Sequence, residues 1–198
     1  MNTTAGSRSR PDGPPENIFL VGLMGAGKTS VGKLLAKRLN KTFYDSDREL
    51  ERSTGVKIPL IFEIEGESGF RARESRLLAD LVCRSNIVLA TGGGAVLSHE
   101  NRKLLVGHGF VIYLRAAVDD LWRRTRHDKN RPLLQTGDAL NKLHELFIER
   151  DPLYREVADI IVDTGSQSLG SLVNKVEQVL LHLEPSSPRA LGAAARSS

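Results

Sequence analysis

The sequence of residues 18–29 is IFLVGLMGAGKT, an apolar run followed by a glycine-rich stretch that ends in lysine and threonine. The part from 22 to 29 fits the phosphate-binding pattern G-x-x-x-x-G-K-[ST] at every fixed position. The apolar run indicates a buried strand, and apolar side chains recur at helical spacing from 31 to 39. Glycines let the backbone wrap so that its N–H groups converge on phosphate oxygens at a helix N-terminus. We therefore predict a phosphate-binding loop between a strand and a helix.

This loop supplies the predicted contacts to a nucleotide and its metal ion. Lys28 is expected to reach the terminal phosphates, and the Thr29 hydroxyl is expected to help hold Mg²⁺. The other loop residues that we predict to bind ATP are Gly25, Ala26, Gly27 and Ser30.

The composition of the chain suits one soluble domain, with 198 residues of which 40% are hydrophobic and 26% are charged. Its net charge is only +4, and no basic stripe is interleaved with aromatic residues, so we expect no nucleic-acid partner. No apolar run approaches the roughly 18 residues that cross a bilayer, so we expect no membrane association. The single cysteine, Cys83, cannot form an internal disulfide, which fits the cytoplasm. Its neighbours Leu81 and Val82 indicate a helix face turned to the core.

The two ends of the chain differ from its middle. Residues 1–16 and 185–198 contain few bulky apolar residues and much Ser, Pro, Gly, Ala and Arg, so we predict disordered tails around a single domain at 17–184. The Pro- and Gly-rich segment 11–15 stands where a secretory signal would need an apolar stretch. The Ser, Thr and Arg content of the first ten residues leaves a short organelle-targeting segment open.

Four more short apolar runs follow the first, with helical patterns between them. Continuous apolar runs of this kind are typical of a parallel sheet that is covered on both faces. The five strands are predicted at 18–21, 42–44, 87–90, 110–114 and 160–162. We predict an α/β fold, a doubly wound, three-layer αβα arrangement around a five-stranded parallel sheet.

Ligands of such sheets bind at the carboxyl ends of the strands, where this sequence has two aspartates and three glycines. Asp45 is the candidate to hold Mg²⁺ through a water, and Asp47 is the candidate to orient an attacking hydroxyl in phosphoryl transfer. The alternative is that Ser46 or Asp47 caps the helix expected to begin near Arg48. Consecutive glycines at 92–94 favour a close approach by a ligand or a neighbouring part of the chain over a merely flexible turn.

Two groups of arginines allow structural interpretations. Arg71 and Glu74 lie three residues apart on one predicted helix and can form a surface pair. Three arginines end another predicted helix, where cations suit the negative end of the dipole; they are Arg123, Arg124 and Arg126.

Two further arginines have open interpretations. Arg131 lies in the polar segment 127–138, which is a candidate lid that brings one arginine to the phosphates. Arg150 precedes a proline at 152 that interrupts the helical pattern, so it is either a site residue or a charge at a helix end. The five histidines show no ligand spacing with cysteine or carboxylates, so we expect no transition-metal site.

Taken together, the motifs resemble the shikimate kinase family from about 17 to 183. They are the loop at 22–29, Asp45-Ser46-Asp47, Gly69-Phe70-Arg71-x-x-Glu74, Thr91-Gly92-Gly93-Gly94, Arg131-Pro132-Leu133-Leu134 and Arg150-x-Pro152-Leu153-Tyr154. The phosphate loop alone is shared by many unrelated proteins, but this combination and order are specific.

The resemblance implies a fold, an activity and a setting. The fold would be that of P-loop, nucleoside-monophosphate-kinase-like enzymes, with a substrate-binding region at about 46–76 and a lid at about 127–138. The activity would be ATP-dependent phosphorylation of the 3-hydroxyl of shikimate, with Mg²⁺, in the pathway to chorismate and the aromatic amino acids. We expect a cytoplasmic monomer.

The resemblance also implies roles for single residues. The shikimate-binding positions correspond to Asp47, Arg71, Gly93 and Arg150, with the two arginines on the substrate carboxylate. The catalytic positions correspond to Lys28, Asp47 and Arg131, the last of which would also contact ATP. Supporting positions correspond to Glu74, which would hold Arg71 and Asp47, and to Gly92 and Gly94. Gln167 falls near the adenine site.

Two alternatives stay open at this point. One is a related kinase on the same scaffold, such as a gluconate or nucleoside monophosphate kinase, which would lack the joint set of Asp47, Arg71 and Arg150. The other is a nucleotide-dependent switch that binds ATP without turnover, against which Asp45, Asp47 and Arg131 argue.

Overall fold

The computed structural model describes residues 15–126, 138–165 and 167–182. Of the tail predicted at 1–16, only Pro15 and Glu16 are described, and of the lid predicted at 127–138, only Asp138. The tail predicted at 185–198 and the candidate lid residue Arg131 lie outside the described residues.

Five parallel strands form one sheet in the order β2-β3-β1-β4-β5. The strands are β1 (Ile18–Val21), β2 (Thr42–Asp45), β3 (Ile87–Ala90), β4 (Phe110–Arg115) and β5 (Ile160–Asp163). The register pairs Phe19 of β1 with Leu89 of β3 and with Val111 of β4. These central strands are buried along their length, which is why their sequences are continuous apolar runs. The predicted parallel sheet is confirmed.

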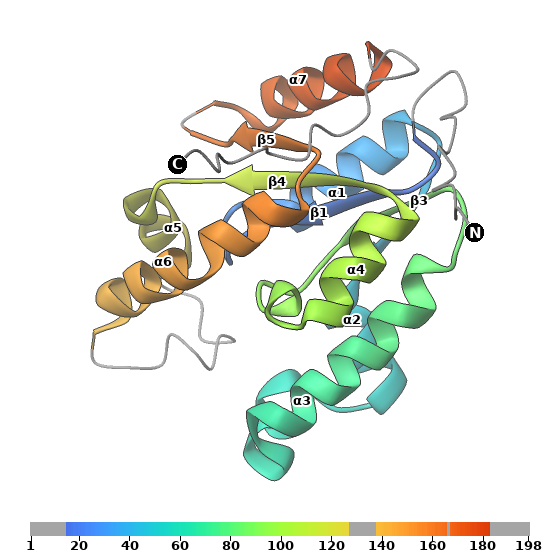
Figure 1. Cartoon of the computed structure of the whole chain (residues 1–198). Helices are drawn as coiled ribbons and strands as arrows, with labels where there is room; N and C mark the ends of the chain where they lie inside the picture. Colours follow the sequence, from blue (N-terminus) through green and yellow to red (C-terminus); the bar gives the residue numbers. More distant parts are fainter. Residues whose placement is uncertain (1–14, 127–137, 166, 183–198) are drawn as a thin grey trace, which may run out of the picture.

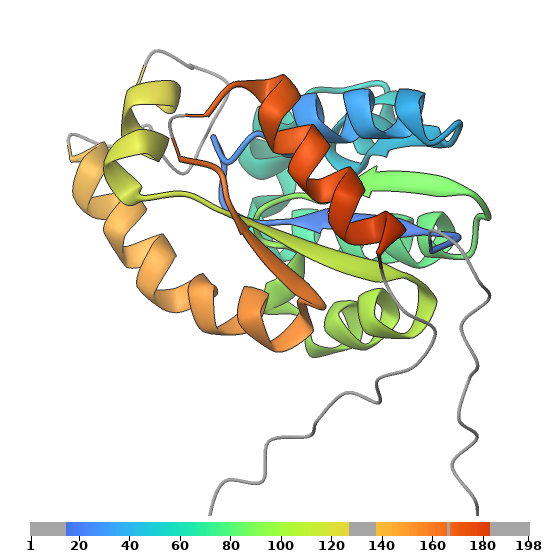
Figure 2. The same ribbon diagram turned by 90° about the horizontal axis from the view of Figure 1, so that it is seen from above.

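Helices cover both faces of the sheet (Figure 1). They are α1 (Lys28–Arg38), α2 (Ser46–Thr54), α3 (Ile58–Val82), α4 (His99–His108), α5 (Val118–Thr125), α6 (Ala139–Val157) and α7 (Leu169–Leu181), with a short 3₁₀ helix η1 (Ala95–Leu97) after β3. Figure 2 shows α7 lying beside α1 on one face. On the other face lie α3, α4 and α6. This is the predicted three-layer αβα arrangement.

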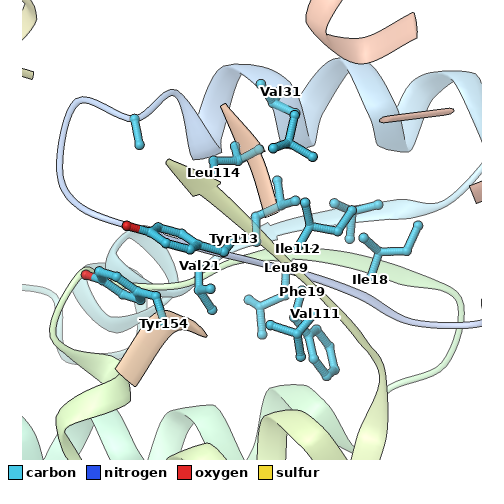
Figure 3. Packing of buried hydrophobic residues seen from close by; sticks show 14 of the residues in the cluster. Ile18, Phe19, Val21, Val31, Leu89, Val111, Ile112, Tyr113, Leu114 and Tyr154 are labelled. Carbon is cyan, nitrogen blue, oxygen red and sulfur yellow. The ribbon is translucent and has the colours of Figure 1, made fainter. Parts of the chain in front are cut away.

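The main core lies between these layers and the sheet. Figure 3 shows side chains from β1, β3 and β4 packed together, with Tyr113 of β4 beside Tyr154 of α6. A second, smaller cluster joins α2 to α3 through Leu50, Ile61 and Phe70. This second cluster falls in the segment predicted to bind substrate.

The helix α3 is broken at Gly66, where φ is 68° and ψ is −177°. A positive φ of this size favours glycine, so the chain can turn there without the strain that a β-carbon would add. Arg73 spans the break, because its Nε and Nη2 atoms donate 2.7 Å hydrogen bonds to the two carboxylate oxygens of Glu65. The segment before Gly66 therefore has its own orientation relative to the rest of α3.

Two local expectations are wrong. Cys83 is exposed rather than turned to the core, because α3 ends at Val82 and Cys83 is the residue that follows it. Pro152 does not interrupt α6, which continues to Val157. The carbonyl that Pro152 leaves without a helical N–H donor belongs to Ile148, whose residue is 74% exposed, so water can reach that side of the helix.

Within the described part of the chain, no helix combines the length and the apolar character that a membrane span requires.

Candidate active site

The phosphate-binding loop lies between the carboxyl end of β1 and the first turn of α1. Gly25 and Gly27 adopt φ values of 81° and 96°, in the left-handed region that favours glycine. Gly27 is the N-cap of α1, so the unpaired N–H groups of that helix face the space that the loop encloses. The backbone therefore has the shape of the predicted loop.

Lys28 folds back over this loop. Its Nζ atom donates hydrogen bonds to the carbonyl oxygens of Gly22 at 2.7 Å and Leu23 at 2.9 Å. Phosphate oxygens can replace these carbonyls, because an ammonium group forms stronger hydrogen bonds with an anionic acceptor. Lys28 is thus held beside the space where phosphates would lie.

The hydroxyl of Thr29 meets the carboxylate of Asp45. Thr29 Oγ1 donates a hydrogen bond of 2.7 Å to Asp45 Oδ2, which joins the start of α1 to the end of β2. Asp45 Oδ1 accepts from the backbone N–H of Arg48, so the cap of α2 is Asp45, and the alternative that Ser46 or Asp47 caps it is wrong. A hydroxyl and one carboxylate are ligands that suit Mg²⁺, which usually keeps several waters and binds substrate phosphates. Among the described residues, no group of three or more His, Cys, Asp or Glu side chains could hold a metal by itself.

Arg71 and Glu74 form a pair that lines the pocket, with a partly exposed guanidinium and a buried carboxylate, not the surface pair expected from their spacing. The Nη1 atom of Arg71 donates a 2.7 Å hydrogen bond to Glu74 Oε2, and only 3% of Glu74 is exposed. Glu67 accepts from the other side of the same guanidinium, at 3.3 Å from Nε and 3.0 Å from Nη2. Burial raises the pKa of Glu74, and the charge of Arg71 opposes that rise. The guanidinium is therefore fixed from two sides.

The glycines after β3 make room for these side chains. A β-carbon on Gly92 would lie 2.5 Å from Glu74 Oε1 and 2.8 Å from Asp47 Oδ1. A β-carbon on Gly94 would overlap the guanidinium of Arg71. The close approach expected at these glycines is therefore made by side chains of α2 and α3.

Gly93 differs from the glycines on either side of it. A β-carbon there would be 3.6 Å from the carbonyl oxygen of Gly22 and 3.7 Å from the hydroxyl of Tyr154, which is ordinary contact. Unlike at Gly92 and Gly94, no side chain of the protein makes the expected close approach at Gly93 in the part of the chain that the structure describes. Its carbonyl accepts a hydrogen bond from Tyr154.

Arg150 lies inside α6, and its interpretation as a charge at a helix end is wrong. Only 3% of it is exposed, and its charge acts on both Glu74 and Tyr154. A charged group this deeply buried costs free energy unless anionic or polar groups surround it. Arg150 therefore adds a second cation on the side of the site that holds Arg71.

One pocket of about 600 Å³ unites these groups. It is lined by every residue of the predicted site that the structure describes: Gly25, Ala26, Gly27, Lys28, Thr29, Ser30, Asp45, Asp47, Arg71, Glu74, Gly92, Gly93, Gly94, Arg150 and Gln167. Apolar side chains of α3 line it beside Arg71, and two leucines of α7 line it beside Gln167; they are Ile58, Phe62, Phe70, Leu169 and Leu172. The phosphate loop thus lies between two ends of the pocket. One end has Arg71 and apolar side chains of α3, and the other has Gln167 and leucines of α7.

Arg124 is a pocket residue that the sequence did not reveal. Its guanidinium donates to the carbonyl oxygen of Gly25 at 3.2 Å, to Thr164 Oγ1 at 3.3 Å and to the carbonyl oxygen of Gly165 at 2.7 Å. Gln167 lines the same end and donates to the carbonyl oxygen of Asp163 at 2.8 Å. No spacing signal separates Arg124 from the neighbouring arginines, because only the fold decides which of them faces the pocket.

The fold and the pocket define a P-loop kinase that acts on a small molecule, with a phosphate loop in the same pocket as two arginines, of which Arg150 is buried and Arg71 is partly exposed. The shikimate kinase family model matches residues 24–181. A shikimate kinase from Nitrosospira multiformis is 64% identical over 164 residues, which cover 83% of this chain and 84% of that protein. The structure of a shikimate kinase from Acinetobacter baumannii in complex with shikimate is 51% identical, with a TM-score of 0.82, and the match covers 84% of this chain and 93% of that one. The chain belongs to the shikimate kinase family.

A gluconokinase from Sinorhizobium meliloti has a TM-score of 0.50 at 18% identity, over 87% of this chain and 93% of that one. At this identity the likeness shows the fold alone. The gluconate kinase alternative therefore shares the scaffold with this chain.

Proposed function

We propose that this chain transfers the γ-phosphoryl group of ATP to the 3-hydroxyl of shikimate, giving shikimate 3-phosphate and ADP in the pathway to the aromatic amino acids. The observation that carries the proposal is that the phosphate loop and two arginines, Arg71 and Arg150, line one pocket. Membership of the shikimate kinase family supports the same reaction.

Binding of the acceptor is assigned to the end of the pocket beside α3 and α6. Arg71 and Arg150 would bind the carboxylate of shikimate, since a guanidinium can donate two parallel hydrogen bonds to it. Asp47 would accept hydrogen bonds from ring hydroxyls and orient the one that attacks, and Gly93 would donate its backbone N–H. Glu74 supports this arrangement through its hydrogen bond with Arg71.

Binding of the donor is assigned to the loop and to the other end of the pocket. Thr29 and Asp45 would hold Mg²⁺, the latter through a water, and the ion would neutralise charge on the phosphates. Lys28 would exchange its two carbonyl partners for phosphate oxygens. Gln167 and Arg124 would lie at the adenine end.

Catalysis in this arrangement depends on position more than on proton abstraction. The transition state of phosphoryl transfer demands little from a base, so Asp47 chiefly aligns the hydroxyl with the phosphorus. Lys28 neutralises charge that develops on the transferring group. Arg131, which lies outside the described residues, is proposed to add a second cation from a lid at 127–138.

The proposal extends to the organisation of the protein. We assign the reaction to a single domain at 17–184 and expect a monomer. A cytoplasmic location is proposed with it, because the reaction consumes ATP and the chain carries only one cysteine.

An acceptor screen tests the function. ADP release with ATP and Mg²⁺ is measured against shikimate, gluconate and nucleoside monophosphates, and NMR of the product locates the phosphate. We expect turnover with shikimate alone and a phosphate on the 3-oxygen. ADP release only with another acceptor, or ATP binding without acceptor-dependent turnover, would refute the proposal.

A further inference from the structure

Tyr154 contacts the proposed acceptor site but has no part in the chemistry proposed so far. It lies in α6, four residues after Arg150, and is 0% exposed. Its hydroxyl donates a hydrogen bond of 2.5 Å to the carbonyl oxygen of Gly93. The side chain therefore joins α6 to the loop that follows β3.

This hydrogen bond determines how the peptide after Gly93 is oriented. The carbonyls of Gly92 and Gly94 accept from the backbone N–H groups of Ala95 and Leu97, within the same turn of chain. The carbonyl of Gly93 instead accepts from a side chain that is 61 residues away in sequence. Glycine has little steric restraint on rotation, so a hydrogen bond of this kind decides which way its peptide faces.

The same hydroxyl also interacts with Arg150. Burial raises the pKa of Tyr154 and keeps the group protonated, while the positive charge of Arg150 opposes that rise. A protonated hydroxyl keeps its donor function, so it can hold the carbonyl of Gly93. Tyr154 thus stands between two groups that are assigned to shikimate.

The ring of Tyr154 is held in place by its neighbours. It packs against Tyr113 with 4.9 Å between the ring centroids, and the two hydroxyl groups point the same way in Figure 3. Tyr113 donates a 2.8 Å hydrogen bond to Asp151, which also pairs with Arg155 at 2.6 Å. Burial and these contacts leave the hydroxyl of Tyr154 little freedom, so its position is set before any ligand arrives.

We propose that Tyr154 is a positioning residue for shikimate, which ties the backbone at Gly93 to α6, the helix that carries Arg150, and so keeps these two parts of the acceptor site together. The inference rests on the proposed function, because it takes Gly93 and Arg150 as contacts of the acceptor. A positioning residue of this kind improves acceptor binding without touching ATP.

The test compares two substitutions that each remove one buried hydroxyl from the stacked ring pair. Tyr154→Phe should raise the KM for shikimate by about threefold to tenfold, the size expected for one hydrogen bond, and leave the KM for ATP within about twofold. Tyr113→Phe should leave both KM values within about twofold, although it also removes a hydrogen bond. Both variants should lower the melting temperature. A rise in the KM for shikimate that occurs only in Tyr154→Phe therefore cannot be a consequence of lost stability. In NMR spectra of the free protein, Tyr154→Phe should shift the amide resonances of Gly93 and Gly94, and Tyr113→Phe should not.

Three outcomes would overturn the inference. They are an unchanged KM for shikimate in Tyr154→Phe, an equal rise in the KM for ATP, and an equal effect of Tyr113→Phe. If Tyr154→Phe does not fold, Tyr154→Met, which also lacks the hydroxyl, takes its place. Arg150→Ala separates this inference from the proposed function. If Arg150→Ala weakens shikimate binding and Tyr154→Phe does not, the positioning role alone fails, whereas no effect of Arg150→Ala refutes the assigned acceptor site.

Discussion

Glu74 Oε1 and Asp47 Oδ1 face the same α-carbon, that of Gly92, where no β-carbon occupies the space between them. Glu74 comes from α3 and Asp47 from α2, so the two carboxylates meet only because both helices pack beside the end of β3. Glu74 Oε1 is buried and has no hydrogen-bond partner among the described residues, whereas Oε2 binds Arg71. One oxygen of the Glu74 carboxyl group therefore has a hydrogen-bond donor, and the other lies near the carboxylate of Asp47.

Gly92→Ala should disturb the packing of the Glu74 and Asp47 carboxylates beside residue 92. The new methyl group would lie 2.5 Å from Glu74 Oε1 and 2.8 Å from Asp47 Oδ1, so side chains must move. We expect the free energy of unfolding to fall by about 1–3 kcal/mol, as for other overpacked sites, and the KM for shikimate to rise. Urea denaturation and steady-state kinetics measure the two effects.

Gly107→Ala is the matched control for Gly92→Ala. Gly107 lies in α4, and a β-carbon there would meet nothing within 4 Å. It should stabilise the protein by about 0.5–1 kcal/mol through helix propensity and leave the KM for shikimate unchanged. Equal behaviour of the two variants would contradict the steric explanation.

The buried carboxyl of Glu74 should make stability depend on pH. Burial raises its pKa in the folded protein above the ordinary 4.5, so the folded state binds the proton more tightly than the unfolded state. The resulting stabilisation is complete below 4.5 and is lost as the pH rises through the folded pKa. We expect the difference in unfolding free energy between the natural protein and Glu74→Gln to shrink as the pH rises from 4.5 through the pKa of Glu74 in the folded protein.

Urea denaturation of both proteins at a series of pH values above 4 measures this difference. Glu74→Gln keeps the size of the side chain and removes its titration, so it serves as the reference. A difference that grows with pH would show that ion pairing with Arg71 outweighs burial.

Arg124→Ala should weaken the binding of ATP but not of shikimate. The guanidinium of Arg124 links Gly25 of the phosphate loop to Thr164 and Gly165 after β5. Losing these hydrogen bonds should raise the KM for ATP by about threefold to tenfold. Arg123→Ala is the control, because Arg123 pairs with Asp120 at the surface and does not line the pocket. If the KM for shikimate rose by the same factor, the assignment of Arg124 to the ATP end of the pocket would be wrong.

Lys28→Ala should lower kcat by about a hundredfold or more, because a cation that stabilises developing charge is lost. Circular dichroism should still show a folded protein, since the backbone of the loop is shaped by its glycines. Lys33→Ala changes an exposed lysine on the same helix and should leave kcat unaltered. A Lys28→Ala variant that retains most of its turnover would remove Lys28 from the proposed catalytic residues.

Much of the fold followed from local pattern. The apolar runs predicted all five strands, and β2, β4 and β5 are each only one residue longer than expected. The strand order was not predictable in this way, because it depends on which helix crosses which face of the sheet. The expectation for Cys83 failed because helical periodicity does not show that α3 ends at Val82.

The candidate site was predictable to a different degree. Lys28 and Thr29 follow from a local motif, since the loop and the helix after it are continuous in sequence. Arg71 and Arg150 needed the resemblance to a family, because spacing alone left each with a structural interpretation. Arg124 was missed, because adjacent arginines on a helix differ only in the direction that packing gives them.

By itself, the sequence determined the phosphate loop, the parallel sheet and the residue types that follow each strand, because these depend on contacts between near neighbours. Only the tertiary structure decided which side chains meet. The carboxylates of Glu74 and Asp47 share the space over Gly92, and the hydroxyl of Tyr154 reaches Gly93 from α6. The physical reason is that these partners are far apart along the chain, so their distances are set by how α2, α3 and α6 pack beside the carboxyl ends of the strands.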